Sequence, residues 1–193
     1  VTWKLVPLTT YPGYEGWPAF SPGGKQVAFA WTGPDQGPMD IYVKLIGAAH
    51  SLRLTSGPQR KYSPVWSPDG TQIAFLRDIG QSRSEVCLVP ALGGPERQVA
   101  EINGDWIGIF DGHLDWSADG RWLITSDRAS EDAPYSLTLL AVDGREKRRL
   151  TTPPPLALGD AGPAVSPDGR TLAFLRCPSF LVCDVYSQAL SQD

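Results

Sequence analysis

The sequence predicts an all-β fold made of repeated sheets, on three observations. A short turn motif ending in glycine recurs four times along the 193 residues. Around each copy, apolar residues hold matching positions on both faces of a strand-like run, and no segment shows helical periodicity. Repeats of nearly fifty residues are typical of solenoids and propellers. Together they predict a β-propeller of four four-stranded blades.

The repeated turn sets the spacing of the blades. Its copies have glycines 46, 50 and 49 residues apart and are Ser21–Gly24, Ser67–Gly70, Ser117–Gly120 and Ser166–Gly169. The serine can bond back to the turn backbone, proline fixes φ in three copies, and the last glycine tolerates positive φ. Each copy therefore predicts a tight hairpin between two strands.

The strands follow in order from this hairpin. An innermost strand precedes the turn and ends at Phe20, Trp66, Trp116 and Val165. The strand after it is apolar on both faces, as expected when a sheet packs between two others. The third strands are predicted at Asp40–Leu45, Glu85–Val89, Ser136–Leu140 and Asp184–Tyr186. The outermost strands are predicted at Leu52–Thr55, Arg97–Ala100 and Arg148–Thr151.

We expect residues 1–193 to form one propeller domain or half of one. Blade 1 covers about 11–55, blade 2 about 56–101, blade 3 about 102–152, and blade 4 about 153–193 with strand 1–10. Leu8-Thr9-Thr10 matches Leu54-Thr55-Ser56 of an outermost strand, so residues 3–10 should complete blade 4. The pairing could occur within the chain, as a four-bladed ring, or with a second chain, as an eight-bladed homodimer. The chain could also be part of a longer propeller.

Composition excludes several classes of function. The formal net charge of −4 offers no basic surface for nucleic acid. No apolar run approaches the roughly 18 residues of a membrane span. Cys87, Cys177 and Cys183 are odd in number and lack a paired spacing, so we expect small buried thiols and no disulfide framework.

The segment Trp66–Gly70, followed by Gln72–Phe75, resembles the TolB-type propeller repeat, a relative of WD repeats, and the likeness covers nearly the whole chain. The resemblance implies a propeller fold and a bacterial protein of the periplasm or cytoplasm. Such repeats occur in periplasmic TolB, in sensor portions of bacterial regulators, in propellers attached to peptidases and in propeller lyases. A shared fold does not fix the function.

No catalytic, phosphate-binding, cofactor or metal motif appears in the sequence. The irregular third repeat is therefore the first candidate for a site. His113 and Asp115 lie two apart on its innermost strand and so share a face. The loop before them contains Asp105, Trp106 and Asp111. These residues predict a polar site at the channel mouth, and a buried hydrogen-bond network is the alternative.

A second candidate is the ring of residues that enter the innermost strands. Glu15, Trp17 and Tyr62 hold such positions, and exposed aromatics beside charges suit protein or peptide contacts. The alternative is that Trp17 and Tyr62 only cap the core. We therefore expect a non-catalytic binding, interaction or sensory module for a protein, peptide or small ligand. The alternatives are a lyase or glycan-active enzyme using His113 with Asp115 or Asp111, and a propeller fragment without a function of its own.

Overall fold

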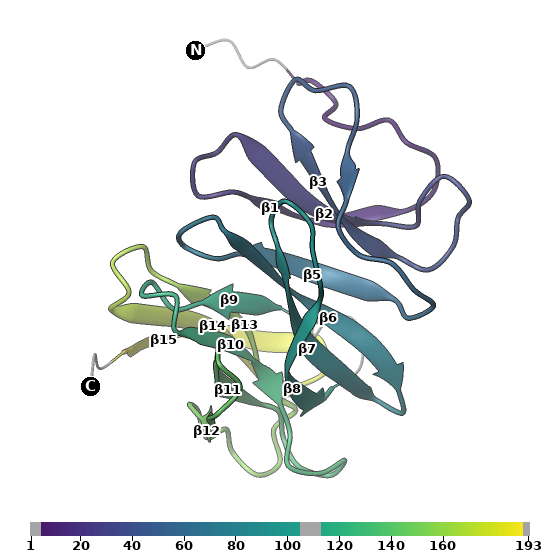
Figure 1. The fold of residues 1–193 in the computed structure, drawn as a ribbon. Helices are drawn as coiled ribbons and strands as arrows, with labels where there is room; N and C mark the ends of the chain where they lie inside the picture. Colours follow the sequence, from purple (N-terminus) through teal and green to yellow (C-terminus); the bar gives the residue numbers. More distant parts are fainter. Residues whose placement is uncertain (1–4, 105–112, 191–193) are drawn as a thin grey trace.

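The computed structural model describes residues 5–104 and 113–190, which form fifteen strands in four antiparallel sheets (Figure 1). No helix occurs in these two ranges, so none there is long and apolar enough to cross a membrane. The all-β prediction is confirmed. Within each sheet the strands pair in the order in which they follow in the chain.

We number the sheets along the chain. Sheet 1 contains β1 (Glu15–Phe20), β2 (Gln26–Trp31), β3 (Asp40–Leu45) and β4 (Leu52–Arg53). Sheet 2 contains β5 (Lys61–Trp66), β6 (Gln72–Gly80), β7 (Arg83–Pro90) and β8 (Arg97–Asn103). Sheet 3 contains β9 (Leu114–Trp116), β10 (Trp122–Asp127), β11 (Ser136–Ala141) and β12 (Lys147–Arg149). Sheet 4 contains β13 (Gly159–Val165), β14 (Thr171–Ser179) and β15 (Val182–Ala189).

The predicted hairpins are present at the repeated turns. In the second copy the Gly70 amide donates to the Ser67 carbonyl at 2.9 Å, and the Gln72 amide donates to Ser67 Oγ at 3.0 Å. Asp69 accepts a hydrogen bond from Ser67 Oγ at 2.6 Å. Gly70 has a φ of 71°, in the region that favours glycine. The serine thus fixes the loop, and the glycine allows the reversal.

Gly70→Val should lower stability by about 1–3 kcal/mol, because a β-branched residue resists positive φ. A Cβ at this position would meet only the Pro22 ring at 3.6 Å, so the loss should come from the backbone. Thermal melts followed by circular dichroism measure it. Gly23→Val is the matched control, since a Cβ there meets nothing within 4 Å and φ is not positive. Equal melting points for the two variants would contradict the prediction.

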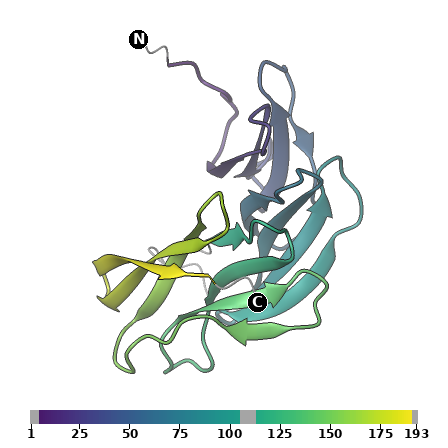
Figure 2. The same cartoon turned by 90° about the vertical axis from the view of Figure 1, so that its left-hand side faces the viewer.

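Neighbouring sheets pack in chain order, and both faces of the second strand are buried in sheets 1 to 3, whereas β14 of sheet 4 is buried on one face. One apolar cluster joins sheets 1 and 2, a second joins sheets 2 and 3, and a third joins sheets 3 and 4. Figure 2 shows the sheets side by side along the chain. The indoles of Trp66 and Trp116 each donate to a carbonyl of the preceding sheet, at Ala19 (3.0 Å) and Val65 (3.4 Å). The tryptophan column before the turn therefore ties each sheet to the one before.

Closure within the chain, one of the two predicted alternatives, does not occur among the residues that the structure describes. Residues 5–14 form no strand, and β15 pairs only with β14 among the described strands, so sheet 4 has three strands. The Leu-Thr-Thr pattern identified a segment like an outermost strand. Sequence similarity does not specify which sheet edge such a segment reaches, because the pairing is non-local.

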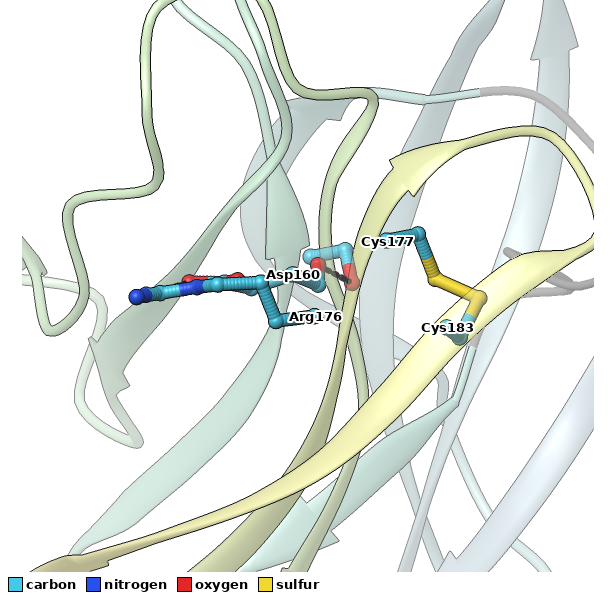
Figure 3. Close-up of a disulfide and its surroundings, with 5 residues drawn as sticks. Asp160, Arg176, Cys177 and Cys183 are labelled. Carbon is cyan, nitrogen blue, oxygen red and sulfur yellow. Dashed lines mark hydrogen bonds and ion pairs between the residues drawn. A yellow bond between two sulfur atoms is a disulfide. The ribbon is translucent and has the colours of Figure 1, made fainter.

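The expectation of three unpaired thiols is also wrong. Cys177 and Cys183 form a disulfide across the β14–β15 hairpin, with their Cα atoms 4.1 Å apart (Figure 3). The hairpin turn brings together two cysteines whose six-residue spacing gave no signal. Cys87 is a free, buried cysteine, as expected, and burial raises the pKa of its thiol to about 12. This thiol is therefore unreactive.

Cys183→Ser should destabilise the chain by about 2 kcal/mol, as expected when a short loop loses its cross-link. A strong reductant should lower the melting temperature of the wild type toward that of the variant. The variant itself should not respond to the reductant, and this is the internal control. A wild-type melt unaffected by full reduction, verified by thiol titration, would contradict the prediction.

Candidate functional site

Asp115 lies near the end of β9, whereas the other described candidates, Glu15, Trp17, Tyr62 and His113, lie at one edge of the sheets, where the innermost strands begin. β1, β5 and β13 begin at this edge, and the β2–β3, β6–β7 and β10–β11 connections lie on it, since Glu15 pairs with Trp31 and Trp31 with Asp40. We call it the entry edge. The Ser-to-Gly turns lie at the opposite edge. Chain segments enter the innermost strands at the entry edge.

A bulge near the start of the innermost strand shapes this edge. The register shifts between Gly16 and Ala19, and comparable shifts occur in β5 and β13. Trp17 and Ser63 take a φ of 51° and 53°, values unusual for residues other than glycine. Each bulged residue precedes a proline, which cannot donate to the ladder. The recurring residue-proline pair was the missed signal, because a bulge turns its side chain away from the regular alternation.

Aromatic rings of Trp17 and Tyr62 meet across sheets 1 and 2. Their centroids are 5.8 Å apart, and the Arg60 guanidinium lies 5.6 Å from the Trp17 ring and 5.5 Å from the Tyr62 ring. Tyr14 approaches Trp17 from the other side at 5.9 Å. Tyr62 is buried, and its hydroxyl lies 3.0 Å from Ser84 Oγ. Trp17 is half-buried, so it is the ring of this pair that a partner can reach.

Charged residues occupy the entry position of sheets 1, 2 and 4. Lys61 Nζ bonds Asp40 at 2.9 Å, and Asp160 pairs with Arg176 at 2.7 Å (Figure 3). Glu15 differs, because Oε2 accepts a hydrogen bond from the Thr9 hydroxyl at 2.8 Å and none of the ion pairs of the described residues includes Glu15. Its Oε1 is buried and has no hydrogen-bond partner in the described part of the chain. Glu15 therefore has an unused acceptor, and Tyr14 and Trp17 are its neighbours in the sequence.

Asp115 is bonded to backbone amides on two sheets. One carboxylate oxygen accepts from the Trp116 amide at 2.8 Å, and the other accepts from the Val165 amide of sheet 4 at 2.6 Å. Burial raises the pKa of this carboxyl, against the lowering effect of the two amides. The His113 side chain is exposed, and its carbonyl accepts from Thr125 Oγ1 at 3.1 Å. Asp105, Trp106 and Asp111 lie outside the described residues.

Asp115→Ala should destabilise the chain by about 2–3 kcal/mol, because two partly buried amides lose their acceptor. Asp115→Asn should have a smaller effect, since its amide oxygen can still accept one bond. A raised native pKa makes the stability contribution of Asp115 greatest below the ordinary carboxyl pKa. That contribution should then fall as pH rises toward the native value. Urea titrations at several pH values test this, and a wild-type advantage over Asp115→Asn that grows with pH would contradict it.

A polar pocket of about 490 Å³ lies at the entry edge between sheets 2 and 3. Its walls come from the β6–β7 hairpin, the end of β8 and the β10–β11 connection, and include Arg83, Asn103 and Arg128. The Arg128 guanidinium lies 4.9 Å from the Tyr135 ring, and Asn103 Nδ2 donates to the Arg128 carbonyl at 3.0 Å. Sequence reasoning missed this pocket because its side chains lie outside the repeat columns.

The described ranges contain no assembled metal site. No group of three or more His, Cys, Asp or Glu side chains there could hold a metal ion. The carboxylates at the entry edge contact hydroxyls and basic side chains of the chain itself.

Comparisons with known proteins agree with the repeat architecture. The family described as the TolB beta propeller domain matches residues 2–179. An uncharacterized peptidase, YuxL of Bacillus subtilis (strain 168), is 24% identical over 80% of this chain and 22% of its own length. The uncharacterized protein Atu1656 of Agrobacterium fabrum is 30% identical over 86% of this chain and 55% of its own length.

Among solved structures, TolB from Acinetobacter baumannii superposes with a TM-score of 0.72 at 19% identity. The match covers 92% of this chain and 41% of that structure. At this level of identity the likeness establishes the fold alone. The chain spans less than two thirds of the length of each of these three proteins.

Proposed function

Because the chain belongs to the TolB beta propeller domain family, we propose that it is a non-catalytic module that binds a protein or peptide at its entry edge. The resemblance of the Trp66–Phe75 segment to this family's repeat is thereby confirmed. Family membership alone leaves the function open, since one fold serves many functions. The proposal therefore depends on the residues of the edge itself.

The observation that supports it is the unused acceptor of Glu15. A buried carboxylate oxygen without a partner is unfavourable, and a donor supplied by a ligand would relieve it. Tyr14 and Trp17 flank Glu15 in the sequence, their ring centroids lie 5.9 Å apart, and aromatic faces attract cations. A carboxylate beside such rings suits the side chain of lysine or arginine. The partner is accordingly a peptide segment that presents a basic residue.

Selection from a random heptapeptide library displayed on phage tests this proposal. The wild-type chain should enrich sequences that contain lysine or arginine. Glu15→Gln keeps an oxygen for the Thr9 hydroxyl but removes the charge, so it should lose that enrichment. Glu146→Gln, an exposed change at the opposite edge, is the matched control and should select as the wild type does. The proposal is wrong if no peptide is enriched or if Glu15→Gln selects the same basic sequences.

A second candidate is the propeller portion of a peptidase, which the match to the peptidase YuxL favours. In that case the chain would recognise peptide substrates while another part of the polypeptide cleaves them. The chain alone should then leave a dipeptidyl p-nitroanilide intact. Hydrolysis by the purified chain would contradict both candidates, because each assigns it binding only.

The Cys177–Cys183 disulfide supports an oxidising compartment for this module. Disulfides persist in secreted and periplasmic proteins and are rare in the cytosol. Of the two compartments that the resemblance implies, the periplasm therefore fits better.

A further inference from the structure

The third strand of sheet 4, β15, is exposed to solvent, whereas the third strands of the other sheets are buried. Val185 of β15 is 78% exposed. Its counterparts by repeat and pairing are Ile41, Val86 and Leu137, and all three are fully buried. Val185 thus marks an apolar surface that is buried in every other repeat.

The fourth strand explains part of this difference. In sheet 1, Thr55 Oγ1 accepts from the Ile41 amide at 2.9 Å, while the Leu54 amide donates to the Ile41 carbonyl at 2.8 Å. In sheet 3, Thr151 and Leu150 make the same two bonds to Leu137, at 2.9 and 2.7 Å. A Leu-Thr pair therefore holds the start of the third strand in both sheets. Sheet 4 has no such pair at Val185 among the described residues.

Residues 5–10 contain the missing pair. Leu8 and Thr9 precede Glu15 at the same spacing at which Leu54 and Thr55 precede Lys61. The Thr9 hydroxyl donates to Glu15 at 2.8 Å, which leaves its oxygen able to accept from an amide. The segment belongs to no sheet, and Leu5 and Val6 are exposed. Residues 5–10 thus precede sheet 1 in the sequence just as the outermost strand β4 precedes sheet 2. Unlike β4, they belong to no sheet among the described residues.

Sheet 1 also lacks a preceding neighbour. Phe20 is 68% exposed, whereas its counterparts Trp66 and Trp116 are buried against the sheets that precede them. At each junction within the chain, one side of a sheet packs on the opposite side of the next sheet. The exposed sides of sheets 4 and 1 are the equivalents of these two sides. They do not pack on each other in the single chain, since none of the apolar clusters of the described residues contains residues of both sheets.

We propose that two copies of the chain join head to tail about a twofold axis, with residues 5–10 of each copy forming the fourth strand of sheet 4 in the other. The repeat fixes the register. Arg53 lies opposite Tyr42 and Leu52 opposite Val43, so Pro7 should lie opposite Tyr186 and Val6 opposite Ser187. The Thr9 hydroxyl should accept from the Val185 amide. The two exchanges are equivalent, so the assembly closes and leaves no further edge.

Light scattering on the purified chain over a range of concentrations is the first test. The mass should approach twice the 20.9 kDa of one chain. Deleting residues 1–10, or changing Val185→Lys, should give a folded species of single-chain mass. Leu92→Lys, at an exposed apolar residue in the β7–β8 connection, is the matched control and should stay dimeric. A wild-type chain that stays single, or a deletion variant that still dimerises, would overturn the proposal.

Cross-linking tests the register itself. An equimolar mixture of Val6→Cys and Ser187→Cys chains should form an intermolecular disulfide under mild oxidation, visible on a non-reducing gel. A mixture of Val6→Cys with Asp184→Cys should not, because those positions lie three residues out of register. Equal cross-linking of both mixtures, or none in the first, would show that these strands do not pair in this way.

Discussion

Gly159→Ala should destabilise the chain by about 3 kcal/mol or more, or prevent folding altogether. Gly159 has a φ of 134°, and a Cβ there would overlap the backbone nitrogen, Cα and oxygen of Tyr135. That backbone is held in place, because the Asp160 amide donates to the Tyr135 carbonyl at 2.8 Å and the Tyr135 amide donates to the Leu158 carbonyl at 3.0 Å. Neither segment can move aside without losing these bonds.

Urea unfolding measures the effect. Gly104→Ala is the matched control, since its Cβ would meet the same Tyr135, through a ring carbon at 3.5 Å, without positive φ. This control should stay within about 1 kcal/mol of the wild type. If both variants unfold at the same urea concentration, the close approach of the two backbones is not a constraint on the fold.

Asp40→Ala should destabilise the chain by about 3–5 kcal/mol, because it leaves the Lys61 charge buried without its carboxylate. Asp40 and Lys61 are each 1% exposed, and the ammonium lies 2.9 Å from the carboxylate. The Asp40 carboxylate also accepts from Arg53 and from the Thr55 hydroxyl. Removing this one group therefore breaks the side-chain ion pair between sheets 1 and 2 and two further contacts within sheet 1.

The double variant Asp40→Ala/Lys61→Met separates the buried charge from the lost bonds. It should be more stable than Asp40→Ala alone, because no buried charge remains. Lys61→Met alone should cost less than Asp40→Ala, since the aspartate keeps Arg53 and Thr55. Chemical denaturation of the three variants decides the matter. Strictly additive losses would mean that the ion pair has no role beyond its separate contacts.

The fold could be predicted from the sequence because the turn residues and the apolar columns of each repeat favour the same structure, a hairpin within a packed sheet. Ser67 and Gly70 specify their own hairpin, and the apolar columns that follow can be buried only between sheets. The closure of the propeller was not predictable in the same way. Leu8 and Thr9 show what residues 5–10 resemble, but the partner edge depends on contacts between distant parts of the chain.

The candidate site was predicted less well, for reasons that differ among its residues. Strand alternation placed Asp115 on a definite face, but it could not show that this face meets the Val165 amide of the next sheet. The position of Trp17 near the entry edge was expected. The bulge that orients its side chain was not, because residues other than glycine rarely take a positive φ. The disulfide depended on hairpin geometry that a count of cysteines does not contain.

The bulge before each proline also bears on how such a chain can diversify. Trp17, Ser63 and Gly162 take nearly the same backbone conformation with unrelated side chains. The bulged position is thus uncoupled from the ladder on either side, and its residue can change without altering strand register. Ser63 is buried, whereas Trp17 and Gly162 are partly exposed, so randomising codons 17 and 162 would vary one rim of the molecule without changing the strand register. Recognition of new partners could therefore evolve repeat by repeat, with the interior of the protein left as it is.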